Sequence, residues 1–400
     1  MALAAHFAPM CVLTFNGYYK SAAPLDPSMT NDVRELTREL VSISSHEDET
    51  AAGDAIEAWL REETDAEVTR DEAGNTAERS SARSGMGSGN VFARKGSGPT
   101  LALVGHHDVV PPADEQVKGG EYVVEERDGR LYGRGAADMK GAVAAAMYAF
   151  RDADPAGELV FASFVGEESG GVGARHAIEN GFSPEYAIVC EGSTNYSGSD
   201  VTDVAVAHKG RRGSTITARG SASHASEPEA GENAIYRACE AVETIRGFDA
   251  PETTVLGNRL SGSIAVTEIE GGSAMNVIPD RCTVTVDERT VPGERAPMEC
   301  VDGIDGVEWA VDQDLPPMRC SDENFAEAVL AAARREQDGE PALVGKPHAT
   351  DAGWLAAAGT ACVVCGPAEP GEAHTSEESV SLDVLSRCYR LYREAATNNL

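Results

Sequence analysis

A short apolar run that ends in a polar triplet constrains the fold of this chain more than any other stretch. Leu101–Val104 lacks helical periodicity and is short enough to be a strand buried on both faces, as in a parallel sheet. Gly105 ends the run, and His106, His107 and Asp108 follow. Alternate side chains of an extended segment share a face, so His106 and Asp108 point one way and His107 the other. Open α/β folds bind ligands at the carboxyl ends of their strands. The pair of His106 and Asp108 at such an end therefore indicates either half of a metal site or a chance pair of surface residues.

Strand, polar residue and helix follow one another repeatedly in the first half of the chain. Leu159–Val165 runs into Glu167 and Glu168, and Tyr186–Val189 runs into Glu191. A Gly-rich stretch at residues 133–141 leads into an Ala-rich helix. This alternation predicts an α/β fold with a mostly parallel sheet.

The pattern changes from about residue 208. Alternating, half-buried strands and an amphipathic helix at Glu232–Arg246 predict a small inserted α+β domain; the strands are Thr215–Arg219, Ser263–Glu268, Cys282–Asp287 and Gly306–Val311. After Pro316-Pro317 the α/β pattern returns. Since 400 residues exceed what one core usually holds, we expect one domain from residues 29–207 and 317–400 and a second from residues 208–316.

Two segments are expected to be poorly ordered or flexible. Residues 1–28 lack the basic start and apolar core of a signal peptide, so we expect a poorly ordered extension followed by a helix capped at Asn31 or Asp32. Residues 74–90 are rich in Gly and Ser and predict a flexible surface loop. No run reaches the roughly 18 apolar residues of a membrane span, so no membrane partner is expected.

The charge balance excludes one class of partner. Acidic residues outnumber basic ones, 66 to 33, for a formal charge of −33, and nucleic-acid binding needs a basic face. The acids are spread along the chain, which favours a halophilic surface over a cation-binding acidic protein. Nine irregularly spaced cysteines do not form a disulfide pattern and favour the cytoplasm, and Cys362–Cys365 is expected to be a buried strand.

Strand ends and Gly-rich turns supply a set of metal-ligand residue types without cysteine: His106, Asp108, Asp138, Glu167, Glu168, Glu191 and His374. This mixture is typical of zinc or cobalt hydrolases. Each residue alone could be a cap or a solvated charge. Jointly they favour a metal site, because charged groups rarely gather at one sheet edge without a cation. Gly133-x-Gly135-x-x-Asp138 lacks the third glycine of a dinucleotide loop.

These motifs carry a family resemblance. His106-x-Asp108-Val-Val-Pro, Gly133-Arg134-Gly135-x-x-Asp138-Met139-Lys140-Gly141, Glu167-Glu168, Glu191 and Ala373-His374-Thr375 occur in order. Over residues 29–400 the chain resembles the zinc-dependent family that contains acetylornithine deacetylase, succinyl-diaminopimelate desuccinylase, aminoacylase and glutamate carboxypeptidase. The resemblance implies a dimetal peptidase-like catalytic domain, residues 29–207 and 317–400, with the insert at 208–316 as a lid or dimerisation domain.

The resemblance also implies roles for the set. Asp138 bridges two divalent ions, zinc or cobalt; His106 and Glu191 complete one site, and Glu168 and His374 the other. Glu167 is the general base, Asp108 orients His106, and the Asp138–Met139 peptide is cis. The chemistry agrees, since two closely spaced cations need a shared anion, and the neighbours Glu167 and Glu168 point in different directions.

The inserted domain resembles the family's lid. The resemblance implies that His224 reaches the active site of a partner subunit and stabilises the oxyanion there. It also implies that Asn276 and Arg289 hold the carboxylate of the substrate, for which an Arg fork is suited. The chain is therefore expected to be a homodimer joined through the lid.

We therefore expect a cytoplasmic dimetal amidohydrolase that removes an acetyl or succinyl group from an amino acid such as ornithine, lysine or diaminopimelate. Glu191 resembles the family's deacylases and carboxypeptidases, whereas its aminopeptidases tend to have Asp there. A dipeptidase or carboxypeptidase of the same family is one alternative, and a non-catalytic dimeric binding homologue is another. A serine hydrolase is disfavoured because the chain has no Gly-x-Ser-x-Gly motif.

Overall fold

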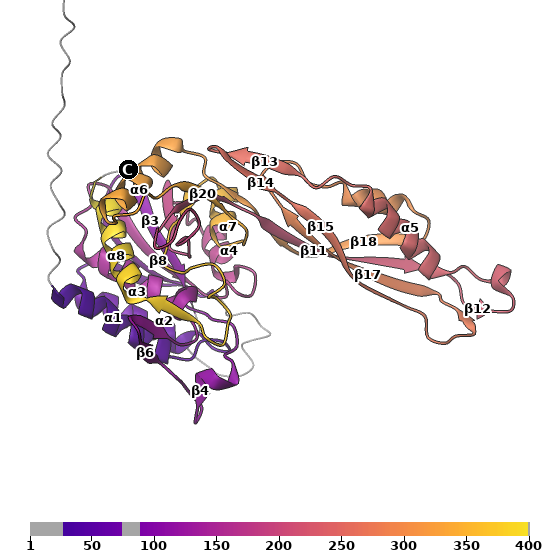
Figure 1. Cartoon of the computed structure of the whole chain (residues 1–400), viewed down its shortest axis with the longest axis horizontal. Coiled ribbons are helices and arrows are strands. Elements are labelled where there is room, and N and C mark those ends of the chain that lie inside the picture. The colour runs from indigo at the N-terminus through magenta and orange to yellow at the C-terminus, as the bar shows by residue number, and fades with distance from the viewer. Residues whose placement is uncertain (1–26, 74–88, 399–400) are drawn as a thin grey trace, which may run out of the picture.

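The computed structural model describes residues 27–73 and 89–398 as a rounded body with a long projecting arm (Figure 1). Nearly all of the predicted extension and most of the 74–90 loop lie outside the described residues. Helix α1 (Pro27–Ser42) begins before Asn31 and Asp32, so the predicted cap is wrong. A proline has its backbone φ preset for the first position of a helix, which explains the earlier start.

The body is built on a nine-stranded sheet with a parallel centre. The order is β1 (Glu67–Arg70), β2 (Val91–Gly96), β8 (Glu158–Phe164), β3 (Thr100–His106), β9 (Tyr186–Val189), β21 (Ala361–Val364), β10 (Val204–His208), β19 (Met318–Arg319), with β20 (Leu343–Lys346) also beside β10. Strands β8, β3, β9 and β21 pair in parallel. The mostly parallel α/β sheet is thus confirmed, and its antiparallel pairs lie toward the margins.

Helices cover both faces of this sheet. One hydrophobic core joins it to α1, α2 (Thr50–Glu63), α3 (Gly141–Asp152), α6 (Glu323–Arg335) and α8 (Leu382–Thr397). A second joins the other face to α4 (Val172–Glu179) and α7 (Ala352–Ala357). Along β3, Leu101 and Leu103 enter the first core while Ala102 and Val104 enter the second, which confirms a strand buried on both sides. Gly105 lets α3 approach closely, because a Cβ there would lie 2.9 Å from Val143 Cγ2.

The arm is an antiparallel sheet covered by one helix. Its strand order is β15 (Ser263–Gly271), β17 (Arg281–Thr290), β11 (Gly210–Arg219), β18 (Val307–Leu315), and α5 (Ala234–Arg246) packs on it around a separate core. The chain enters the arm from β10 and returns to the body at β19. The pair β12 (Ser223–His224) and β16 (Val277–Ile278) lies at the far tip (Figure 1), and the hairpin β13 (Glu252–Val255) and β14 (Asn258–Ser261) lies near the body.

Short strands complete the body: β4 (Val117–Lys118), β5 (Glu121–Tyr122), β6 (Glu125–Arg127), β7 (Arg130–Tyr132) and β22 (Ser379–Ser381). Strand β22 pairs with β7, and Glu378, the residue just before β22, accepts a hydrogen bond from the Gly133 N–H just after β7. No helix within residues 27–73 and 89–398 has the length and apolar character needed to span a membrane. The eight described cysteines are free thiols, and Cys362 and Cys365 are buried, as predicted.

Candidate metal centre

The carboxyl ends of the parallel strands bring the predicted ligands together. His106 ends β3, Glu167 and Glu168 follow β8, and Glu191 follows β9. Asp138 lies in the turn before α3, and the Asp138–Met139 peptide is cis, as expected. His374 lies between β21 and β22 in the left-handed region, with φ 66°. Because β8, β3 and β9 are neighbours in register, their ends converge on one edge.

Asp138 lies between two groups of donors. Its Oδ1 is 3.0 Å from His106 Nε2, which is 3.4 Å from Glu191 Oε1. Its Oδ2 is 3.2 Å from His374 Nε2, which is 2.9 Å from Glu168 Oε1. Each carboxylate oxygen of Asp138 therefore faces a different imidazole, as a ligand shared by two ions must.

The donor spacing fits divalent cations. Bonds of about 2.1 Å in tetrahedral geometry place two ligand atoms of zinc roughly 3.4 Å apart. The four contacts around Asp138, from 2.9 to 3.4 Å, are compatible with that spacing. Two triads of donors, His106, Asp138, Glu191 and Asp138, Glu168, His374, could each hold an ion. The set contains nitrogen and carboxylate oxygen only, the mixture expected of zinc or cobalt.

The electrostatics of this cluster favour positive charge. Burial alone lowers the pKa of His106, but Asp108, Asp138 and Glu191 raise it well above its usual range. Contacts with Asp138 and Glu168 raise the pKa of His374 to about 10. Both imidazoles thus respond to an excess of negative charge, which cations would neutralise.

Glu167 and Asp108 are linked through the backbone. One oxygen of the Asp108 carboxylate accepts a hydrogen bond from the Glu167 N–H, and the other accepts one from the Glu168 N–H, at 3.1 and 3.0 Å. Asp108 Oδ1 is also 3.4 Å from His106 Nδ1, and the Asp108 carbonyl is 3.1 Å from that nitrogen. Burial raises the pKa of Glu167 well above its usual range. Asp108 therefore contacts the base candidate, Glu167, and two ligand candidates, Glu168 and His106.

His107 does not join the donors. Its Nδ1 is 2.9 Å from Ser163 Oγ, and its buried Nε2 has no hydrogen-bond partner among the described residues. Burial lowers the pKa of this imidazole to about 3. The strand alternation thus places His106, and not His107, at the cluster.

The predicted arm residues are not gathered with the donors of this chain. His224 and Asn276 are exposed at the tip of the arm, where the Ala225 N–H donates to the Asn276 carbonyl at 2.9 Å. Arg289 lies at the base of the arm, near the end of β17, and its Nε donates to Asp287 Oδ1 at 2.8 Å. Asp287 also accepts from Arg211 at 2.7 Å.

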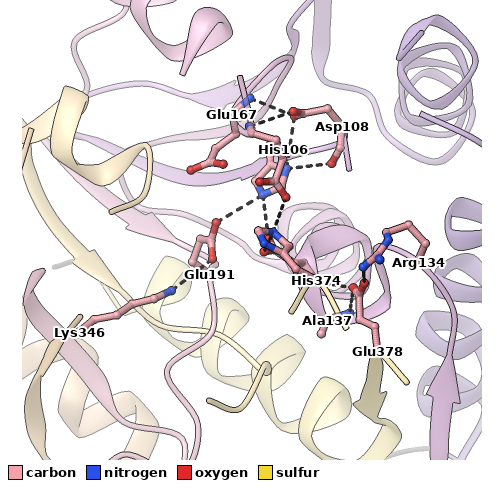
Figure 2. A network of polar contacts seen from close by, with 11 residues as sticks. His106, Asp108, Arg134, Ala137, Glu167, Glu191, Lys346, His374 and Glu378 are labelled. Atoms are coloured by element: carbon pink, nitrogen blue, oxygen red, sulfur yellow. Dashed lines mark hydrogen bonds and ion pairs between the residues drawn. The ribbon is translucent and has the colours of Figure 1, made fainter. Parts of the chain in front are cut away.

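Two buried ion pairs beside the metal-ligand candidates were not predicted from the sequence, and both are visible in Figure 2. Lys346 Nζ is 3.2 Å from Glu191 Oε2, on the oxygen that does not face His106. Arg134 pairs with Glu378, which also accepts backbone hydrogen bonds from residues 137 and 138. The sequence gives weak hints of both residues. Lys346 is one of only six lysines in the chain, and Arg134 lies inside the Gly133–Gly141 motif.

Comparisons with known proteins find a matching sequence family and individual relatives. Residues 102–398 match the sequence profile of Peptidase family M20/M25/M40. A succinyl-diaminopimelate desuccinylase of Alkalilimnicola ehrlichii is 30% identical over 334 residues, 75% of this chain and 85% of that protein. An acetylornithine deacetylase of Myxococcus xanthus is 29% identical over 77% of this chain and 83% of its own length.

Solved structures share the fold. Aminopeptidase PepT from Bacillus cereus superimposes with a TM-score of 0.73 at 20% sequence identity, covering 92% of this chain and 98% of that one. At this identity the likeness concerns the fold, including the combination of body and arm. The fold alone does not specify the reaction.

Proposed function

The chain belongs to peptidase family M20/M25/M40, and on that premise we propose that it is a two-metal amide hydrolase that removes an N-acyl group from an amino acid. The observation that carries the proposal is the position of Asp138, with one carboxylate oxygen facing His106 and the other facing His374. His106 and Glu191 would hold one ion with Asp138, and Glu168 and His374 the other. Zinc and cobalt are the candidates.

The chain's own residues divide the reaction between them. When bound, two divalent ions would polarise the amide carbonyl and make water a stronger acid. Glu167 takes the proton that water loses as its oxygen bonds to the carbonyl carbon. The carbon–nitrogen bond then breaks, and Glu167 returns the proton to the leaving amine. Asp108 holds the backbone of both Glu167 and Glu168, so base and ligand keep a fixed separation.

The active unit in this proposal is a homodimer. His224 lies at the exposed tip of an arm that projects away from its own body (Figure 1). It would therefore reach the metal centre of a second copy of the chain. There it would donate a hydrogen bond to the oxyanion. Asn276 lies on the same tip and would reach the second copy with His224. Arg289 lies at the base of the arm, beside its own body, so Asn276 of one copy and Arg289 of the other would bind the same substrate carboxylate.

The acyl group is proposed to be acetyl or succinyl, and the amino acid ornithine, lysine or diaminopimelate. The named relatives support this choice, since one is a desuccinylase and the other a deacetylase. Glu191, rather than Asp, at its position also supports deacylation over aminopeptidase action.

A substrate panel tests the proposal. N-acetylornithine, N-succinyl-diaminopimelate, carrier-linked lysine and a set of dipeptides are incubated with the metal-loaded protein at low and molar salt. Hydrolysis of an N-acyl amino acid should stop with chelator, return with zinc or cobalt, and fall by about 10²–10⁴ in Glu167→Gln. Glu168→Gln is the matched neighbour, and it should lose metal as well as activity. Inactivity of the loaded wild type on every substrate would instead favour the binding homologue, and cleavage of dipeptides alone would favour the peptidase.

A further inference from the structure

Glu378 makes an unusual set of contacts for a carboxylate that is not a metal-ligand candidate. It is 1% exposed, and its Oε1 accepts hydrogen bonds from the backbone N–H groups of Ala137 and Asp138, both at 3.1 Å. Its Oε2 pairs with the guanidinium of Arg134, which is 3% exposed. The Glu378 carbonyl accepts from the Gly133 N–H at 3.1 Å. One residue therefore holds both ends of the Gly133–Asp138 turn.

Asp138 depends on that turn for its position. It has φ −128° and ψ 92°, outside the helical values that follow from Gly141 onward, so α3 does not fix its backbone. A bridging carboxylate must present its two oxygens in two set directions, and a small backbone rotation would misplace both. Glu378 supplies a fixed acceptor at the N–H of Asp138 itself.

The opposite side of the cluster uses the same arrangement. Asp108 accepts the N–H groups of Glu167 and Glu168, as Glu378 accepts those of Ala137 and Asp138. In each case a buried carboxylate clamps two successive N–H groups at a metal-ligand candidate. Hydrogen bonds from backbone N–H groups to a carboxylate are among the stronger hydrogen bonds in proteins.

We infer that Glu378 is a positioning residue for Asp138, and that it thereby controls the affinity of both metal sites. The segment that carries Glu378 also carries His374, four residues earlier, so it contributes a ligand to one site and the clamp on the ligand shared by both. The inference rests on the proposed pair of ions and not on the identity of the substrate. Loss of such an outer partner typically lowers metal affinity 10- to 100-fold.

The test compares Glu378→Gln with two controls. Glu377→Gln changes the adjacent residue, whose exposed carboxylate pairs with Arg127. Glu288→Gln changes a buried partner of Arg212 in the arm, where the two nitrogen–oxygen distances are 2.7 and 2.8 Å. It thus neutralises a buried arginine–glutamate pair of the same kind outside the metal cluster. Zinc and cobalt affinities are measured by competition with a chromophoric chelator, with cobalt absorption spectra and thermal unfolding of each variant.

We expect Glu378→Gln to weaken both binding steps 10- to 100-fold and to change the cobalt spectrum, because a neutral amide oxygen accepts more weakly than a carboxylate and the amide group cannot pair with Arg134. Both controls should stay within about twofold of wild type. If Glu378→Gln does not fold, Glu378→Asp keeps the charge for Arg134 but withdraws the acceptor from both N–H groups, and it should show the same loss. Wild-type affinities and spectrum in the Glu378 variant would overturn the inference, as would an equal loss in Glu288→Gln. Failure of the wild type to bind two ions would overturn the proposed function as well.

Discussion

Metal removal should destabilise this protein by an amount that depends on which residue at the centre has been changed. Each ion present at 100-fold above its dissociation constant stabilises the native state by about 2.7 kcal/mol. Two ions therefore contribute roughly 5 kcal/mol. With about 2–4 °C per kcal/mol for a large domain, chelation should lower the melting temperature of the wild type by roughly 10–20 °C.

The geometry predicts two different responses to substitution. Asp138 faces His106 Nε2 at 3.0 Å and His374 Nε2 at 3.2 Å, so Asp138→Asn weakens both sites and should remove most of the chelator effect. His374 belongs to one donor triad only, so His374→Ala should remove about half of the effect, roughly 2.7 kcal/mol. Because the side chain of His374 is half-exposed, this variant should leave the core intact.

Differential scanning calorimetry in metal-buffered solution measures these shifts. Each variant is scanned with chelator and with free zinc or cobalt held at 100-fold above the dissociation constant of the wild type. Equal loss of the shift in the two variants would contradict the assignment of His374 to one site. A full wild-type shift in Asp138→Asn would refute the bridging role altogether.

Three further predictions concern the arm, pH and salt. His224→Ala and Glu167→Gln should each be inactive alone, while mixing and re-forming dimers should restore roughly a quarter of wild-type activity if each arm serves the other body; no recovery would contradict a shared site. Burial lowers the pKa of His208 to about 4, so the unfolded chain takes up the proton first as pH falls below about 6.5. From pH 7 to pH 5 the unfolding free energy of the wild type should therefore fall by about 2 kcal/mol more than that of His208→Gln. Urea denaturation at the two pH values measures both, and an equal fall in the two proteins would refute this. With a formal charge of −33, stability should rise between 0.1 and 1 M KCl as the screening length falls from about 10 to about 3 Å; a flat melting temperature would count against a halophilic surface.

Local sequence patterns do not predict the two buried ion pairs, Lys346–Glu191 and Arg134–Glu378. Glu377 and Glu378 are neighbours of identical type, yet one pairs with Arg127 at the surface and the other is buried against the Asp138 turn. The contact between Glu378 and Asp138 spans 240 positions of sequence, and that between Lys346 and Glu191 spans 155. Neither follows from residue type or spacing.

The amino-acid sequence by itself determined the strands, their burial and the kinds of donor at their ends. Apolar runs such as Tyr186–Val189 coincide with the observed strand, because burial on both faces leaves a signature within the run itself. Alternation along residues 101–108 likewise predicted that His106 and Asp108 point to one side and His107 to the other. Only the tertiary structure decided that Asp138 presents one oxygen to each imidazole, that Glu378 clamps its backbone, and that His224 lies far from its own body. Those relations depend on how distant strand ends meet, and periodicity within one segment carries no information about the distance to another.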